Sequence, residues 1–157
     1  MNLQAMLAER ISDGRPVRAG LIGAGKFGSM FLSQVPTIDG LDVTCIADLN
    51  PDRARAACAS VGWDDARIAA VRFEDDGASL ASANDVDVVI EATGNPTAGI
   101  AHALAASEHG KHIVMVNVEA DVLAGAALAR RAAEAGTVYS MAYGDQPALT
   151  AEMVDWA

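Results

Sequence analysis

The stretch VRAGLIGAGKFG, residues 17–28, decides the fold. A short apolar run leads directly into the pattern Gly-x-Gly-x-x-Gly, and an amphipathic segment follows it. In a strand–loop–helix unit, the first glycine (here Gly23) permits the tight turn and the second (Gly25) lets the backbone approach a pyrophosphate. The third (Gly28) lets the helix pack close to the sheet, and the helix N-terminus offers free N–H groups to the phosphates. We therefore predict a dinucleotide-binding loop with contacts from Gly23, Ala24, Gly25, Lys26, Phe27 and Gly28.

An acidic residue stands where such a loop needs one. Asp48 follows a predicted strand, residues 41–47, and lies twenty positions after Gly28. Its carboxylate would accept hydrogen bonds from the ribose hydroxyls and would repel a 2′-phosphate, which favours NAD. Arg53 and Arg55 could offset that repulsion by pairing with the phosphate, or they could form an ordinary solvated helix face. The predicted cofactor is therefore NAD(P), with Asp48 and Arg53 among its contacts.

Strand and helix segments alternate along the whole chain. The predicted strands are residues 17–22, 41–47, 68–73, 87–91, 112–116 and 137–141, and the predicted helices are residues 3–11, 26–35, 50–61, 78–83, 96–108, 121–135 and a last one from about 147. The strand segments are apolar along most of their length, as in a sheet covered on both faces. We therefore predict an α/β fold with a doubly wound, mostly parallel sheet of the Rossmann type. Residues 1–146 would form the dinucleotide-binding domain, and residues 147–157 would begin a helix that leads to a substrate domain outside this chain.

Two further strand ends should reach the same site, because ligands of such sheets bind at the carboxyl edge. In residues 91–96 (EATGNP) small side chains would let the cofactor pass, and Thr93 and Asn95 could hydrogen-bond it. The second segment is residues 116–119 (VNVE). The alternative for Asn95 and Asn117 is the capping of the helices that follow. The contacts predicted from these segments are Ala92, Thr93, Gly94 and Asn117.

Composition and charge exclude several classes of partner. The 157 residues carry a net charge of −10, which argues against binding to nucleic acid or to an anionic membrane. No apolar run approaches the roughly 20 residues of a membrane helix, and the N-terminus has no basic segment of a secretory signal. We therefore expect a cytoplasmic protein with no membrane segment.

The residues that could serve as nucleophiles or metal ligands do not form a pattern. Cys45 and Cys58 lie within apolar sequence and are expected to be core thiols. His102, His109 and His112 lack metal-ligand spacing, so we interpret them as structural or surface residues and predict no metal site.

Several segments together resemble a known group of enzymes. These are GLIGAGKFGSMFLSQV, IADLNPDRA, EATGNP, HIVMVNVEADV and YSMAYGDQPALTAEMVDWA. The chain resembles the NAD(P)-binding domain of the homoserine-dehydrogenase-like superfamily, and within it the bacterial 1-deoxy-D-xylulose 5-phosphate reductoisomerase-like oxidoreductases, some of whose relatives carry a SAF domain. The resemblance implies dinucleotide contacts at residues 23–28, Asp48, Thr93, Gly94 and Asn117, and hydride transfer to or from a sugar-phosphate or polyol-type substrate. The reductoisomerase-like group is associated with NADPH, whereas Asp48 favours NAD.

The sequence departs from the group at one position, and the resemblance leaves the catalytic residues open. True homoserine dehydrogenases have a lysine after the asparagine of this strand end, where Val118 follows Asn117 here, so homoserine is disfavoured as the substrate. Members of the group are longer, so we expect substrate binding through a further C-terminal domain and leave the catalytic residues unknown. Glu119 and Asp145 could border the substrate, or could serve a helix N-terminus and a turn. The chain is thus expected to be the cofactor half of an oxidoreductase that could form a homo-oligomer, or alternatively a dinucleotide-binding regulatory or sensor module without catalysis.

Overall fold

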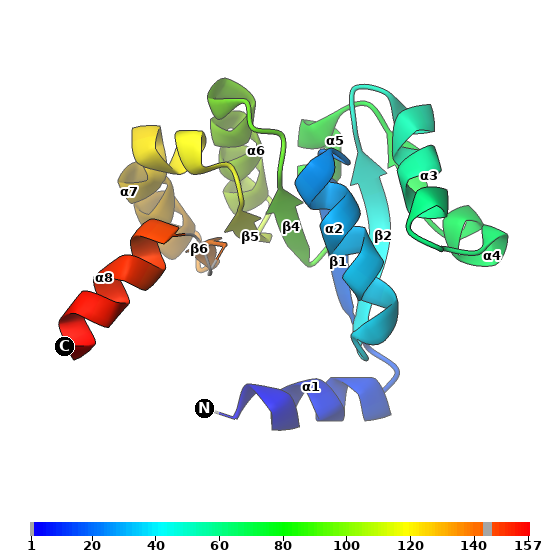
Figure 1. The fold of residues 1–157 in the computed structure, drawn as a ribbon, viewed down its shortest axis with the longest axis horizontal. Coiled ribbons are helices and arrows are strands. Elements are labelled where there is room, and N and C mark those ends of the chain that lie inside the picture. The colour runs from blue at the N-terminus through cyan, green and yellow to red at the C-terminus, as the bar shows by residue number, and fades with distance from the viewer. Residues whose placement is uncertain (1, 143–145) are drawn as a thin grey trace.

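The computed structural model describes residues 2–142 and 146–157. Its six strands form one sheet in the order β3-β2-β1-β4-β5-β6, and every neighbouring pair is parallel (Figure 1). The strands are β1 (Val17–Ile22), β2 (Leu41–Ala47), β3 (Arg72–Glu74), β4 (Val88–Glu91), β5 (His112–Met115) and β6 (Tyr139–Met141). The helices are α1 (Leu3–Ser12), α2 (Lys26–Gln34), the 3-10 turn η1 (Val35–Thr37), α3 (Pro51–Ser60), α4 (Asp65–Ala69), α5 (Gly77–Ser82), α6 (Pro96–Glu108), α7 (Val118–Glu134) and α8 (Gln146–Trp156). The predicted α/β fold of the Rossmann type is confirmed.

The strand order reverses beside β1, which pairs with β2 on one side and with β4 on the other. Opposite the end of β1, Ile22 is in register with Ala47 of β2 and with Glu91 of β4, and the register to β2 shifts between Ala19 and Gly20. In open α/β sheets, the carboxyl edge at such a reversal is where ligands bind.

Helices cover both faces of the sheet. Successive side chains of a strand point to opposite faces, so Leu21 packs into one core cluster and its neighbour Ile22 into the other. The first cluster includes Leu32 of α2 and residues of α3 and α4, and the second includes Leu80 of α5 and residues of α6 and α7. Because both faces are buried, the strands are apolar along most of their length.

The N-termini of the helices differ in how their N–H groups are satisfied. The side chains that accept a hydrogen bond from the first turn of a helix are Asn2 (α1), Asn50 (α3), Asp64 (α4), Asp76 (α5), Asn95 (α6) and Asn117 (α7). The N-cap of α2 is Gly25, which has no side chain to offer. Among the α-helices whose N-caps the structure describes, α2 alone therefore begins without a side-chain cap, and its N–H groups stay available to a ligand.

The region between α3 and α5 corrects the sequence-based prediction. Residues 68–73 were predicted to form one strand, but Ile68 belongs to the short helix α4 and is buried against the core. The helix forms because the Asp64 side chain accepts a hydrogen bond from the Arg67 N–H at 2.7 Å. Of the predicted run, Arg72 and Phe73 lie in a strand, β3, which ends at Glu74. The last predicted helix is confirmed as α8, and α7 begins at Val118 rather than at residue 121 because Asn117 caps it.

Two glycines of the loop after β1 should respond differently to alanine. A Cβ on Gly28 would overlap the backbone carbonyl oxygen of Gly23, whereas a Cβ on Gly25 would meet no atom within 4 Å. We expect Gly28→Ala to lower the free energy of unfolding by about 1–3 kcal/mol, as overpacking does. Gly25→Ala should cost less, at most about 1 kcal/mol, because it creates no overlap and alanine is only a poorer N-cap than glycine. Urea denaturation followed by circular dichroism measures both, and equal effects of the two substitutions would contradict the packing described for α2.

Candidate functional site

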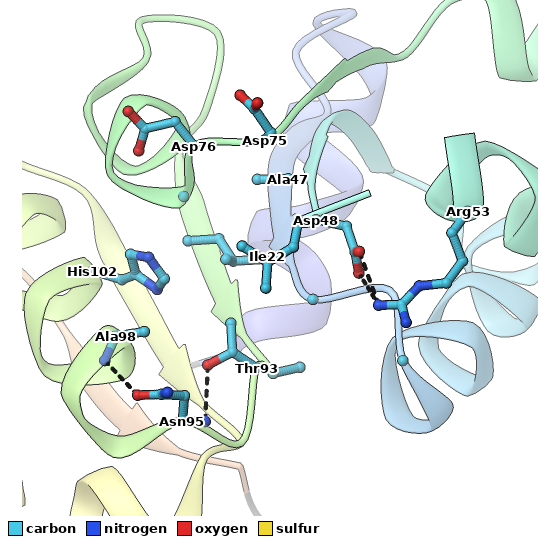
Figure 2. Close-up of a pocket in the computed structure, with 15 residues that line it drawn as sticks. Ile22, Ala47, Asp48, Arg53, Asp75, Asp76, Thr93, Asn95, Ala98 and His102 are labelled. Atoms are coloured by element: carbon cyan, nitrogen blue, oxygen red, sulfur yellow. Dashed lines mark hydrogen bonds and ion pairs between the residues drawn. The ribbon is translucent and has the colours of Figure 1, made fainter. Parts of the chain in front are cut away.

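A cavity of about 450 Å³ opens at the carboxyl ends of the central strands (Figure 2). Its lining residues come from the ends of β1 to β4, from the loops that follow them, and from α3, the start of α5 and the first two turns of α6. They are Ile22, Gly23, Gly25, Ala47, Asp48, Leu49, Arg53, Asp75, Asp76, Gly77, Ala92, Thr93, Asn95, Ala98 and His102. The cavity therefore lies at the reversal of strand order, where the fold favours a ligand.

The loop after β1 forms one wall of this cavity. Gly23 has φ +96° and donates its N–H to the Ala47 carbonyl oxygen at 2.8 Å, so the chain turns sharply away from the sheet. A Cβ on Gly23 would lie 2.8 Å from the Ala92 carbonyl oxygen, which leaves no room for a side chain. Gly25 is exposed at the uncapped N-terminus of α2. Free N–H groups and the positive end of the helix dipole make this wall suitable for a phosphate.

Asp48 is a buried carboxylate at the end of β2. Its Oδ2 accepts the Ala24 N–H at 2.9 Å, its Oδ1 accepts the Asn50 N–H at 3.0 Å, and Arg53 Nη2 reaches both oxygens at 2.9 and 3.0 Å. Burial alone would raise the pKa of Asp48, but the hydrogen bonds from Asn50, Arg53 and Ala24 outweigh it and hold that pKa below the usual value. The carboxylate is therefore ionised at neutral pH and fixed against the phosphate loop.

Behind the opposite wall lies a buried carboxylate whose role could not be recognised from the sequence. Glu91, at the end of β4, is fully buried, and its Oε1 lies 2.6 Å from Thr93 Oγ1 and 3.3 Å from His102 Nδ1. His102 was predicted to be a structural or surface residue, but it lines the cavity. Ala98 and His102, one helical turn apart on α6, face the cavity together. That spacing, directly after the EATGNP segment, was the signal in the sequence that could have revealed them.

The predicted contacts divide into two groups. Those that line the cavity are Gly23, Gly25, Asp48, Arg53, Ala92 and Thr93; those that do not are Ala24, Lys26, Phe27, Gly28, Gly94 and Asn117. Ala24 still takes part through its N–H bond to Asp48. Asn117 is 2% exposed, caps α7 through the Ala120 N–H at 3.1 Å, and reaches the cavity wall through its hydrogen bonds to Thr93 and to the Asn95 carbonyl oxygen. Asn95 caps α6 and also lines the cavity.

Arg55 does not line the cavity, and three further residues do. Arg55, the second candidate partner of a 2′-phosphate, lies with its guanidinium 4.3 Å from the centre of the Phe73 ring. Asp75, Asp76 and Gly77 line the cavity but were not predicted, since they follow the short strand β3 that the sequence analysis misplaced.

The cysteines are core thiols, as predicted. Both are buried, and burial raises the pKa of Cys45 to about 12 and that of Cys58 to about 11, so neither is a thiolate at neutral pH.

The other candidate features were a metal cluster, a membrane-spanning helix and the acidic residues Glu119 and Asp145. Within residues 2–142 and 146–157, no three His, Cys, Asp or Glu side chains gather where they could hold a metal ion, and no helix is long and apolar enough to cross a membrane. Glu119 lies in the first turn of α7, and Asp145 falls outside the described residues.

Comparison with known proteins identifies a family and several solved structures with a similar fold. The model of the GFO_IDH_MocA family, described as an oxidoreductase family with an NAD-binding Rossmann fold, matches residues 17–143. A search of curated proteins gives no significant match.

Three solved structures illustrate the fold. A homoserine dehydrogenase from Thiobacillus denitrificans has a TM-score of 0.67 at 19% identity, over 80% of this chain and 29% of that one. The WlbA dehydrogenase from Bordetella pertussis, in complex with NADH and UDP-GlcNAcA, has a TM-score of 0.66 at 22% identity, over 82% and 37%. Biliverdin reductase from Synechocystis sp. PCC 6803, with biliverdin and NADP+, has a TM-score of 0.65 at 24% identity, over 80% and 37%.

This chain thus spans between 29% and 37% of the length of these three proteins, and at such identities the likeness concerns the fold. The family match is independent of that likeness and covers most of the chain, including the phosphate loop, Asp48 and the end of β4. The chain belongs to the GFO_IDH_MocA family of oxidoreductases with an NAD-binding Rossmann fold.

Proposed function

We propose that this chain is the cofactor-binding part of an oxidoreductase that transfers a hydride between NAD(P) and a substrate bound by protein outside these residues. One observation carries the proposal: the uncapped N-terminus of α2 and the ionised Asp48 carboxylate border the same cavity and are tied together by the Ala24 N–H. When bound, the nicotinamide supplies the hydride chemistry, and the protein binds and orients it.

The residues present fit a dinucleotide. The space above Gly25 is open, so a phosphate could approach the N–H groups of the first turn of α2. The Asp48 carboxylate can accept hydrogen bonds from ribose hydroxyls. Ile22, Ala47 and Ala92 give the cavity an apolar wall against which a flat base can lie.

We further propose that NAD binds in preference to NADP. Arg53, the cation that lines the cavity, already contacts both oxygens of Asp48. Arg55 packs over Phe73, and Asp75 and Asp76 add negative charge to the cavity wall. A 2′-phosphate would have to separate Arg53 from Asp48 and then lie beside the freed carboxylate, which is unfavourable.

For the substrate, we propose a sugar-phosphate or polyol-type molecule. The resemblance to the reductoisomerase-like oxidoreductases supports this class, and the WlbA structure, similar in fold, holds a sugar nucleotide. Val118, directly after Asn117 at the start of α7, stands where homoserine dehydrogenases have a lysine, which disfavours homoserine.

Cofactor binding should stabilise the chain, and Gly25 should be required for it. At about 100 times its dissociation constant a ligand adds roughly 2.7 kcal/mol, which corresponds to an increase of about 5–10 °C in Tm. Gly25→Val should keep the Tm of the free chain within about 2 °C but lose the increase, because its side chain would occupy the space that a phosphate needs. Differential scanning fluorimetry measures both. If millimolar NAD(H) and NADP(H) both leave the wild-type Tm unchanged, the proposed function is wrong.

The cofactor preference should depend on Asp48 and Arg53. Wild type should bind NAD more tightly than NADP, and Asp48→Ser should release Arg53 toward a 2′-phosphate. Because a charge-assisted hydrogen bond contributes about 1.5–3 kcal/mol, the ratio of the NADP to the NAD dissociation constant should fall by about tenfold or more. Adding Arg53→Ala should cancel this change, and Arg55→Ala, the matched control, should not alter it. Calorimetric titration gives each constant, and a wild type that prefers NADP would contradict the assignment.

A further inference from the structure

A series of hydrogen bonds with a fixed direction leads from α7 to the cavity. Asn117 Oδ1 accepts the Ala120 N–H at 3.1 Å, which identifies that amide atom as the oxygen. Asn117 Nδ2 lies 2.9 Å from the Asn95 carbonyl oxygen, which can only accept, so the same orientation is required there. The Nδ2 group therefore also donates to Thr93 Oγ1 at 3.4 Å.

The direction continues through Thr93. Its hydroxyl oxygen accepts from Asn117 Nδ2 and from the Asn95 N–H at 3.2 Å, which uses both lone pairs. The single hydroxyl hydrogen is then donated to Glu91 Oε1, 2.6 Å away. Glu91 Oε1 is therefore an acceptor.

The last step fixes the tautomer of His102. Its Nδ1 lies 3.3 Å from Glu91 Oε1, and because that oxygen already accepts the Thr93 hydrogen as a carboxylate does, we assign the imidazole hydrogen to Nδ1. Glu91 is fully buried, and its Oε2 has no hydrogen-bond partner among the described residues, so Oε1 makes the hydrogen bonds that hold this side chain. In the neutral ring, Nε2 is left with a lone pair and acts as an acceptor.

His102 Nε2 lies against Gly77, and both residues line the cavity. A Cβ on Gly77 would be 2.5 Å from Nε2, so the absent side chain of Gly77 is what allows the ring to lie there. Asp75 and Asp76 also line the cavity, Asp76 on the side of His102 and Asp75 nearer to Ala47 (Figure 2). Arg53 lies at the opposite side, with Ile22 and Ala47 between it and His102 (Figure 2). The side of the cavity at His102 therefore suits a neutral group that donates hydrogen bonds, and not a phosphate.

Resting on the proposed dinucleotide site, we propose that His102 Nε2 accepts a hydrogen bond from the exocyclic amino group of the cofactor's adenine, and that Glu91 positions the ring for it. A base attached to the ribose at Asp48 can lie against Ile22 and Ala47, and adenine carries an N–H donor on its exocyclic nitrogen. Glu91 does not line the cavity and acts through His102, so it is a positioning residue.

The direct test compares NAD with nicotinamide hypoxanthine dinucleotide, in which a carbonyl oxygen replaces the amino group. Two acceptors would then face each other, so the wild-type chain should bind the hypoxanthine compound at least about tenfold more weakly in calorimetric titration. His102→Leu keeps a side chain of similar bulk but has no acceptor, so this ratio should fall to about one.

Three further variants separate positioning from a general loss of structure. Glu91→Leu should also bring the ratio close to one, because the ring loses its anchor. Glu91→Gln keeps an acceptor oxygen for Thr93 and His102 and should retain the wild-type ratio. Asp75→Ala removes one of the two other carboxylates that line the cavity, while Asp76 remains as the N-cap of α5, and should leave the ratio unchanged. The proposal would be overturned if Asp75→Ala bound NAD and the hypoxanthine compound equally while His102→Leu still preferred NAD.

Nitrogen-15 NMR of the histidines tests the tautomer in the unmodified chain, whether or not the variants fold. At about pH 8, above the range in which histidine ordinarily titrates, His102 should carry its hydrogen on Nδ1. His112 is the internal control with the opposite tautomer, because its Nδ1 accepts the Val138 N–H at 3.0 Å. A hydrogen on Nε2 of His102, or equal affinity of wild type for the two dinucleotides, overturns the inference alone. An absence of NAD binding overturns the proposed function with it.

Discussion

The hydrogen bond from the Ala24 N–H to the Asp48 carboxylate is the interaction on which the site depends. It joins the phosphate loop after β1 to the end of β2, two segments that the parallel register already brings side by side. Asp48 can remain ionised while buried only because Asn50 and Arg53 donate to it as well. The same contacts occupy Arg53, so one carboxylate sets both the shape of the loop and the charge that a cofactor meets.

The second constraint is how the helix N-termini are used. At the carboxyl edge of the sheet, α3, α5, α6 and α7 each begin with an Asn or Asp that satisfies their first N–H groups. Among the α-helices with described N-caps, only α2 has no side chain that accepts from its first N–H groups, so a ligand can bind them. Asn95 and Asn117, the N-caps of α6 and α7, also hydrogen-bond to Thr93, which bonds to Glu91. The residues that cap these helices therefore also fix the side of the cavity that contains Thr93 and His102.

Most of the fold and half of the site could be predicted from local sequence. The glycine pattern and Asp48 are close in the chain and have fixed roles, so their placement followed from spacing alone. The strand β3 was misplaced because Asp64 caps a short helix within an otherwise ambiguous run, and Asp75, Asp76 and Gly77 were missed with it. His102 was missed because its role depends on Glu91 and Gly77, which reach it through tertiary packing. Asn117, predicted as a contact, is a buried cap in the structure, where spacing alone could not distinguish the two roles.

The most direct measurement of the central claim is a crystal structure of the chain grown with NAD. We predict a pyrophosphate on the N–H groups at Gly25 and the start of α2, with an adenosine ribose hydrogen-bonded to Asp48 and with Arg53 still paired with that carboxylate. This prediction would be contradicted by a dinucleotide bound away from the carboxyl ends of β1 and β2, or by a ribose that makes no contact with Asp48.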